Sequence, residues 1–358
     1  MATITQDEAR AHILSRHGLA ASFGSPLEAL HSVFAIQVQY ASSLPTALAF
    51  RVKDLKPNWH KQEEHQSVLK CWTLRSTLHA HTADDHAIAL AALRDRLRTR
   101  YLEWFKKDLG FDDESIAQLE AEVFEALREG PLTRVELHEQ VPSLKRIPYA
   151  GWGLDLKGLA FKGQLKVLVT DGGATKFATH ECPGQWSKDE AIAELMRRYF
   201  YAFGPATLAD FRYWTGLFAA DINRAFKLVD MELERVKIEG LSGDRLLFGG
   251  LAAGKIPKVA LLAKFDPLTL GHLDKSLLLP LTDRERVFRK AGQVEAGVLA
   301  DGKFAGTWRL ERKGKFAEVV VEPFRKIAKT RMPGIEREAR KAAKALGLRL
   351  SGVRTLSM

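Results

Sequence analysis

The sequence contains only two cysteines, Cys71 and Cys182, among 358 residues. They lie far apart and neither belongs to a Cys-x-x-Cys pattern, so the sequence indicates neither a disulfide framework nor a thiolate metal motif. We interpret both as reduced packing residues. No metal and no organic cofactor is expected.

Long hydrophobic runs are also missing. No apolar segment approaches the roughly 18 to 20 residues that a membrane-spanning helix needs. The first twelve residues, MATITQDEARAH, have neither the basic start nor the apolar stretch of a signal peptide. We therefore expect no membrane association and a cytoplasmic location.

Positive charge is in excess. The chain has 54 Lys and Arg against 44 Asp and Glu, a net charge of +10, which favours a polyanionic partner. Residues 324–354 alone carry ten Lys or Arg against two Glu. This tail has two interpretations, a phosphate-binding surface or the solvated face of a helix. The helix would bury an apolar stripe of Ile335, Ala339, Ala342, Ala343 and Leu346.

Helix starts are marked by Ser or Thr followed three residues later by an acidic residue, the pattern of a reciprocal capping box. Four starts have Glu at the third position, and a fifth has the shorter Asp, which we expect to cap less well. The pairs are Thr5 with Glu8, Ser25 with Glu28, Thr133 with Glu136, Ser187 with Glu190, and Thr207 with Asp210.

A helix opened by a proline and a capping residue occurs three times, and a predicted hairpin follows each one. The openings are residues 24–30, 128–137 and 202–211, and the hairpins are 69–82, 164–180 and 235–249, the second turning at Asp171, Gly172 and Gly173. Helix, turn, helix and hairpin make a winged helix, so the pattern predicts three of them. Beyond residue 254 the sequence predicts further strands, then the basic helix.

These patterns predict an α+β fold of three tandem winged-helix units and a C-terminal β-rich module. The boundaries expected are 1–110, 111–185, 186–254 and 255–358.

Five segments, in the same order, resemble the AlkZ/YcaQ winged-helix DNA glycosylases. They are FAIQVQYASSLPTALAFRV, WTLRSTLHAHTADD, GPATLADFRYWTGL, KFDPLTLGHLDKS and LADGKFAGTW. The resemblance implies a C-shaped arrangement of three winged helices that holds alkylated DNA in its concavity. It also implies a catalytic Gln-x-Gln or Gln-x-Asp motif, which here is Gln37, Val38 and Gln39.

From the residues alone, Gln37 and Gln39 would point about 200° apart on a regular helix, so they converge only where a helix ends. Pro45 restricts the backbone before it and favours such an end near Gln39. The alternative is two exposed amides near a loop. The resemblance favours a catalytic role, in which the amides position a water molecule.

Four polar residues of the first hairpin, Arg75, Thr77, His79 and His81, would alternate onto one strand face and contact DNA. The family's Thr-Leu-His signature favours Thr77 and His79 as part of the site. Arg212, on a helix of the third unit, is a further candidate for DNA binding.

In the same third-unit helix we expect Trp214 to be a core anchor. Asp266, in the Phe-Asp-Pro segment, is expected to cap the backbone and not to react.

We therefore predict a monomeric, monofunctional DNA glycosylase that acts on double-stranded DNA carrying alkylated purines, with interstrand crosslinks as possible substrates, in the nucleoid. No lysine stands at the motif, so a Schiff-base lyase step is not expected. Two other functions remain open on the sequence: a non-enzymatic winged-helix regulator, and a module that binds protein partners.

Overall fold

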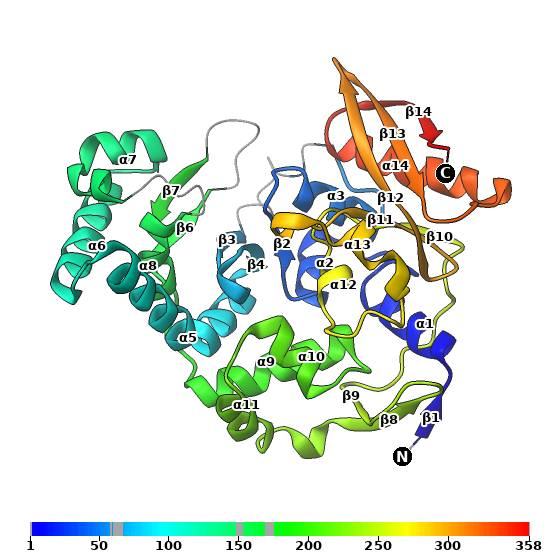
Figure 1. Cartoon of the computed structure of the whole chain (residues 1–358), viewed down its shortest axis with the longest axis horizontal. Helices are drawn as coiled ribbons and strands as arrows, with labels where there is room; N and C mark the ends of the chain where they lie inside the picture. The colour runs from blue at the N-terminus through cyan, green and yellow to red at the C-terminus, as the bar shows by residue number, and fades with distance from the viewer. Residues whose placement is uncertain (1, 58, 60–66, 148–152, 169–174, 358) are drawn as a thin grey trace.

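The structure is a computed structural model, which describes residues 2–57, 59, 67–147, 153–168 and 175–357. The ribbon follows a C, with residues 113–162 at one end, residues 188–247 in the middle and the C-terminal strands at the other end (Figure 1). Among the described residues, no helix is both long enough and apolar enough to cross a membrane.

The first unit has three short helices followed by a hairpin, and a long helix leads out of it. A two-residue strand, β2 (Ile36–Gln37), precedes the third helix and pairs with the second hairpin strand. The other elements are α1 (Gln6–Arg16), α2 (Pro26–Ser32), α3 (Ser43–Arg51), β3 (Val68–Trp72), β4 (Leu78–Thr82) and the exit helix α5 (Ala83–Leu109).

The second unit repeats this order of helices and hairpin. Its elements are α6 (Asp113–Arg128), β5 (Leu132–Thr133), α7 (Arg134–Gln140), α8 (Leu154–Lys162), β6 (Leu165–Val167) and β7 (Lys176–Thr179). The predicted turn at Asp171, Gly172 and Gly173 lies outside the described residues.

The third unit has the same order again, and the N-terminal strand joins its hairpin. Its elements are α9 (Lys188–Phe203), α10 (Leu208–Thr215), α11 (Ala219–Phe226), β8 (Glu234–Ile238) and β9 (Arg245–Leu247), with β1 (Ala2–Ile4) parallel to β8. The α+β fold class is confirmed, and each unit has the helix and hairpin order of a winged helix.

The predicted capping residues lie at helix starts. Full reciprocal boxes form at Thr5, Thr133, Ser187 and Thr207. At Thr207, where the shorter Asp is expected to cap less well, the Asp210 carboxylate also closes the box by accepting from the Thr207 backbone N–H at 2.9 Å. At Ser25 the hydroxyl accepts from the Glu28 N–H, but the Glu28 carboxylate accepts from the N–H of Gly24 instead of closing the box.

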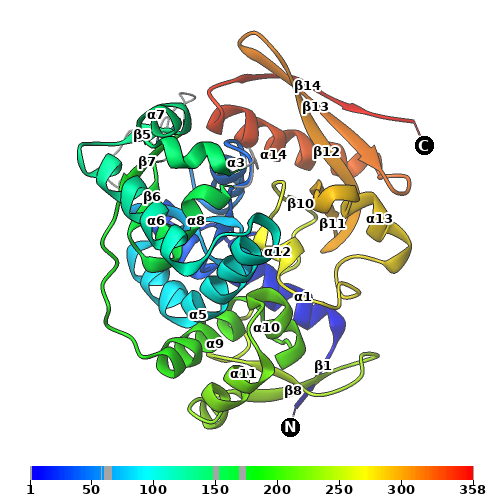
Figure 2. The ribbon, with the colours of Figure 1, turned by 60° about the vertical axis from the view of Figure 1, so that its left-hand side comes forward.

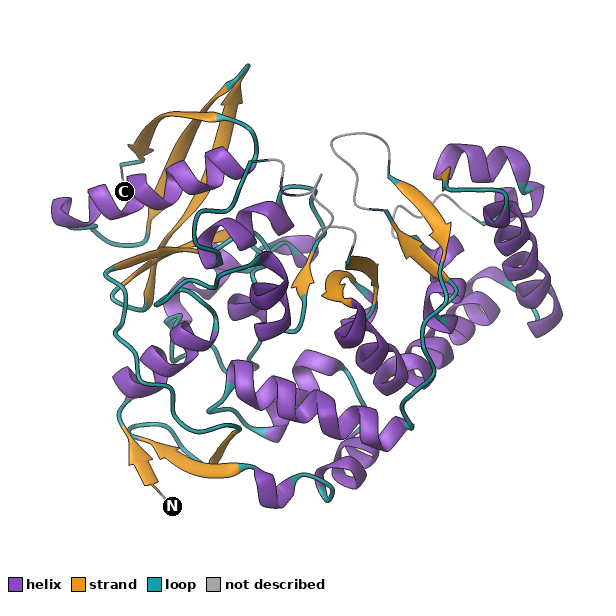
Figure 3. Cartoon of the chain, turned by 180° about the vertical axis from the view of Figure 1, so that it is seen from behind, coloured by secondary structure: helices purple, strands orange, loops and turns teal. Residues whose placement is uncertain are grey.

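The first two hairpins belong to a single sheet. Its strand order is β2-β4-β3-β6-β7-β5, and the two hairpins meet at one pair of residues, Lys70 of β3 and Val167 of β6. Helices surround this sheet on the second unit's side (Figure 3). The sheet therefore crosses the predicted boundary between residues 110 and 111.

The C-terminal region is a five-stranded sheet with one long helix against it (Figure 2). The predicted apolar stripe is confirmed for Ile335, Ala339, Ala342 and Ala343, which are fully buried, while Leu346 is half-buried. The elements are β10 (Val259–Leu261), α12 (Pro267–Leu270), α13 (Arg284–Val287), β11 (Ala296–Ala300), β12 (Lys303–Lys313), β13 (Phe316–Pro323), α14 (Met332–Ala345) and β14 (Arg349–Thr355).

A buried ion pair joins the C-terminal region to the first unit. Arg51, at the end of α3, and Asp266, at the start of α12, are both fully buried. Two hydrogen bonds link them, Nη1 to Oδ2 at 3.0 Å and Nη2 to Oδ1 at 2.7 Å. Asp266 also accepts from the backbone N–H of Leu268, so the prediction that it caps the backbone is confirmed. This pair fixes the end of the helix that follows the glutamine motif.

Candidate active site

The two glutamines lie on an extended stretch and a bend, and the expectation of a helix end was wrong. Gln37 ends β2 and pairs with His79 of β4, so these two side chains share one face of the sheet. The next residue, Val38, still donates its N–H to the Leu78 carbonyl at 2.8 Å. Gln39 follows at a bend. A short strand forms here because the neighbouring hairpin offers an open edge.

The two amides have different surroundings. Gln37 is 6% exposed. Gln39 is exposed and lines a groove of about 500 Å³ between the first and second units. We call it the interwing groove, and its lining includes Gln39, Lys70, Trp72 and Thr77 of the first unit and Arg134, Lys157 and Phe177 of the second. The structure thus places Gln39 in the groove, at the bend after β2, and Gln37 buried at the end of β2, two residues before it.

The charge of the interwing groove has one sign. Lys70, Arg134 and Lys157 line it, and no Asp or Glu among the described residues does. Arg134 is paired with Asp155, at 3.0 Å. Within the described part of the chain, neither lysine has a carboxylate at ion-pair distance. Burial lowers the pKa of Lys70, and burial followed by the charge of Arg100 lowers the pKa of Lys157 to about 8. The charge of Asp155 acts on Lys157 in the opposite sense, but without closing an ion pair. Two poorly hydrated ammonium groups that form no ion pair with a described carboxylate favour an anion such as a DNA phosphate.

A pair of stacked aromatic rings lines the groove. Trp72 of β3 and Phe177 of β7 stack with 6.2 Å between ring centroids and 13° between their planes. Gly153, with φ at +68°, lies so close that a Cβ there would be 2.3 Å from the Trp72 ring. The two walls of the groove are therefore held by apolar packing as well as by the shared sheet.

A family model described as DNA glycosylase AlkZ-like matches residues 30–345, which include both glutamines and the whole groove. The chain belongs to the AlkZ-like DNA glycosylase family. The chain is 27% identical over 331 residues to an interstrand DNA cross-link repair glycosylase from Streptomyces sahachiroi, covering 87% of this chain and 88% of the relative.

The solved structure of Streptomyces sahachiroi DNA glycosylase AlkZ has a TM-score of 0.82 with this chain. It is 24% identical, and the match covers 99% of this chain and 100% of the other. At that identity the likeness shows the shared fold. The predicted family is thus confirmed, and the chain is a DNA glycosylase, an enzyme that hydrolyses N-glycosyl bonds.

In this AlkZ-like glycosylase, Arg75 does not lie on the strand predicted for it. It occupies the turn Leu74–Ser76 with φ at 52°, before β4 begins. Its guanidinium donates to the backbone carbonyl of Trp214 in α10. Arg75 therefore ties the first hairpin to the third unit, and a contact with DNA stays a prediction.

Thr77 and His79 differ in their access to the groove. Thr77 lines the interwing groove, although its hydroxyl donates to the Leu74 carbonyl at 3.1 Å. His79 is 2% exposed, and its Nδ1 lies 3.0 Å from the Thr77 carbonyl. Burial, with the nearby charge of Arg75, lowers the pKa of His79 to about 3, so the ring is neutral at physiological pH.

His81 is fully buried and has protein partners for both ring nitrogens. Its Nδ1 lies 3.2 Å from the Phe34 carbonyl oxygen, which can only accept, so Nδ1 carries the proton. Its Nε2 then accepts from the Thr73 hydroxyl at 2.8 Å. Burial lowers the pKa of His81 to about 3. The ring has no nitrogen to offer to DNA in this conformation, and it supports the strand beside Gln37.

Arg212 and Trp214 face opposite ways on α10. Trp214 is 3% exposed and packs beside Tyr199, with ring centroids 5.0 Å apart, so the expected core role is confirmed. Arg212 is exposed and forms no ion pair with any described residue. Its contact with DNA stays a prediction.

The two lysines of the groove were not among the site residues predicted from the sequence. Lys70 faces Ala80 across the hairpin, whereas Cys71 faces His79, so Lys70 points away from the histidines. Lys157 belongs to a helix of the next unit. Alternation along β3 could have shown that Lys70 lies on the face away from the histidines. No local pattern could have shown that Lys157 lines the same groove.

Proposed function

We propose that this glycosylase hydrolyses the N-glycosidic bond of purines alkylated at N7 or N3 in double-stranded DNA. The observation that carries the proposal is the position of Gln39, which lines a positively charged groove that no described Asp or Glu enters. Such a groove suits a phosphate backbone, and an amide at its wall suits the orientation of a water molecule.

The chemistry explains why an amide is sufficient. Alkylation at N7 or N3 makes the base cationic, so it takes the bonding electron pair of the glycosidic bond and leaves as a neutral molecule. The C1′ carbon develops positive charge and is then attacked by water, whose proton passes to solvent. The enzyme forgoes the roughly 10² to 10⁴-fold contribution of a general base but keeps positioning and electrostatic stabilisation. Undamaged bases are poor leaving groups and are spared.

We assign the contact with the attacking water to Gln39 and the completion of its orientation to Gln37. An amide offers one acceptor oxygen and two N–H donors, and therefore holds water without removing its proton. Gln37 is held by the pairing of β2 with β4, which limits its movement. The buried neutral His79 opposite it adds no charge.

We also propose that the reaction stops at the abasic site. Lys70 and Lys157 line the groove with lowered pKa values, and a lysine with a lowered pKa is able to form a Schiff base. Their role in this proposal is phosphate binding. Borohydride reduction should therefore trap no covalent complex between enzyme and DNA.

The relative from Streptomyces sahachiroi is named for interstrand cross-link repair. We extend that substrate to this chain and propose that it unhooks crosslinks joined through alkylated purines. We also propose that it works as a monomer, bound to the nucleoid in the cytoplasm.

The test is a single-turnover reaction on duplex DNA with one N7-methylguanine, with detection of free base and of the abasic site. Gln37→Ala and Gln39→Ala should each reduce base release by about 100-fold or more, since loss of one positioned polar group has effects of that order. DNA affinity should change little, because a neutral amide adds little to phosphate binding.

Gln118→Ala is the matched control, because Gln118 is an exposed amide of α6 that contacts Glu122 and not the groove. A Gln37→Ala/Gln39→Ala double variant that releases base as fast as the wild type would overturn the catalytic assignment.

A further inference from the structure

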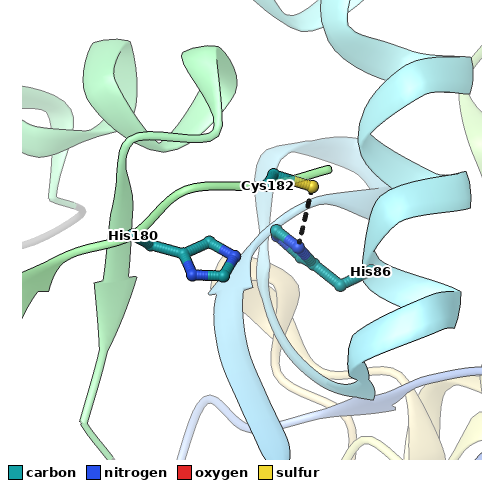
Figure 4. Close-up of side chains that lie close together, drawn as sticks. All are labelled: His86, His180 and Cys182. Carbon is teal, nitrogen blue, oxygen red and sulfur yellow. Dashed lines mark hydrogen bonds between the residues drawn. The ribbon is translucent and has the colours of Figure 1, made fainter. Parts of the chain in front are cut away.

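Three side chains with metal-binding atoms gather where α5 meets the chain that follows β7. His86 belongs to the first turn of α5, while His180 and Cys182 come just after β7 (Figure 4). The Nδ1 atom of His86 lies 3.6 Å from the Cys182 Sγ. One ligand atom from each of the three lies within 4.8 Å of the others.

Backbone hydrogen bonds hold the segment that carries His180 and Cys182. The His180 N–H donates to the Gln164 carbonyl at 2.9 Å, and the Cys182 N–H donates to the Gly163 carbonyl at 3.2 Å. Gly163 has φ at +79°, and a Cβ there would lie 2.9 Å from the Cβ of Cys182. The absence of that atom lets Cys182 pack against the end of α8. The cluster is thus held by backbone contacts and not by flexible surface side chains.

The imidazoles of the cluster have unused nitrogen atoms. The Nε2 atoms of His86 and His180 are buried and have no hydrogen-bond partner among the described residues. His86 is fully buried, and His180 and Cys182 are half-buried, so an ion can enter from solvent. Buried polar atoms in native proteins are nearly always satisfied, so the unpartnered Nε2 of His180 favours a ligand at this place, whereas the His86 nitrogen nearest the thiol is Nδ1.

The protonation states suit a cation that replaces a proton. Burial lowers the pKa of His86 to about 3 and also lowers the pKa of His180, so both rings are neutral and keep a free lone pair. Burial raises the pKa of the Cys182 thiol, although the nearby charge of Arg94 opposes that shift. The thiol therefore keeps its proton until a metal ion displaces it.

We propose that His86, His180 and Cys182 bind one Zn²⁺ ion through two imidazole nitrogens and a thiolate, with a fourth position open to water. With bonds of about 2.3 Å to sulfur and about 2.0 Å to nitrogen, tetrahedral geometry separates the nitrogen and sulfur ligands by about 3.6 Å. The His86 and Cys182 atoms already have this separation. The three ligand atoms lie within 4.8 Å of one another, so closing the longest separation requires a contraction of at most about 1.5 Å. The soft ligand set disfavours Mg²⁺ and Ca²⁺, which prefer oxygen.

The binding step conserves charge and involves no redox change. Zn²⁺ takes the place of the thiol proton, the sulfur–zinc bond forms, and the proton goes to solvent. The ion would link α5 of the first unit to the second unit at a place other than the interwing groove. Its role is a clamp between the two units, and it takes no part in base release.

The experiment uses the full chain, stripped with a chelator and titrated with Co²⁺, which reports thiolate ligation by an absorption band. The wild type should bind one equivalent of Co²⁺ and show the sulfur-to-cobalt band, which should disappear when Zn²⁺ is added. Its melting temperature should be higher with either metal than without. Cys182→Ser should abolish the band. His180→Ala should weaken binding by more than the roughly 10 to 100-fold typical of losing a residue that only supports a ligand.

Cys71→Ala is the control, because it removes the second free cysteine and leaves the proposed ligands. This variant should still bind one equivalent of Co²⁺ and show the sulfur-to-cobalt absorption band. Absence of the band in the wild type at one equivalent overturns the proposal, and so does a band of equal strength in Cys182→Ser. His180→Ala, at a half-buried position, decides the matter if Cys182→Ser fails to fold by circular dichroism.

Discussion

Replacing the two groove lysines by glutamine should change how DNA affinity depends on salt. Lys70 and Lys157 line the interwing groove, and neither has a carboxylate partner among the described residues. Glutamine keeps most of the side chain and removes the charge. Each ammonium that neutralises one phosphate contributes about 0.9 to the slope of log affinity against log salt.

The expected size follows from this count. A fourfold rise in salt weakens binding by about 3.5-fold for each contact, and by about 12-fold for two. Between about 50 and 200 mM salt, the wild type should therefore lose about 12-fold more affinity than the Lys70→Gln/Lys157→Gln variant. Each single variant should lie between the two, with a slope about 0.9 smaller than that of the wild type.

The assay is fluorescence anisotropy on an unmodified duplex at five or more salt concentrations, below pH 7 so that Lys157 is protonated. Lys107→Gln is the control, because Lys107 is an exposed lysine of α5 that does not line the groove. If the double variant has the slope of the wild type, DNA does not occupy the groove, and the site proposed here is in the wrong place.

Three further predictions concern pH, the second glutamine and the buried ion pair. A bound phosphate raises the pKa of Lys157 from about 8, so binding takes up a proton, and DNA affinity should fall as the pH rises above that value. Lys157→Arg should remove the fall in the same anisotropy assay, and a flat wild-type profile would contradict the reasoning. Gln39→Asp should retain or raise the rate of N7-methylguanine release, since a carboxylate can accept a proton from water, whereas Gln39→Leu should abolish it. Equal single-turnover rates for Leu and Gln would refute a role in orienting water. Arg51→Met should lower the free energy of unfolding in urea by about 3 to 5 kcal/mol, because it leaves Asp266 buried without its cation, and adding Asp266→Asn should restore part of the loss. A loss under about 1 kcal/mol for Arg51→Met would show that the pair contributes little.

Local patterns predicted the local structure well. The capping residues at Thr5, Thr133 and Ser187 act within three positions of one another, so the sequence contains the whole interaction. The apolar stripe of α14 and the alternation of the hairpins are local in the same way. These signals were enough to predict the α+β class and the repeated units.

Contacts between distant segments were not predicted, and they decide the site. Gln37 is extended because it pairs with the edge of β4, more than 40 residues later. The residues around Gln37 contain no pattern that predicts this pairing. The histidines of β4 were expected to face DNA because alternation gives two faces without saying which is buried. Lys70 and Lys157 meet only because the two hairpins share a sheet.

The short strand β1 has a consequence for the edges of the third hairpin. Ala2, Thr3 and Ile4 pair with Val236, Lys237 and Ile238, so β8 is an inner strand with neighbours on both sides. Without these three residues, β8 would present a row of unpaired backbone N–H and C=O groups, which is a template for pairing with another chain. Strand β1 thus protects against self-association, and a variant that lacks it should form dimers or aggregates although no residue of the groove is altered.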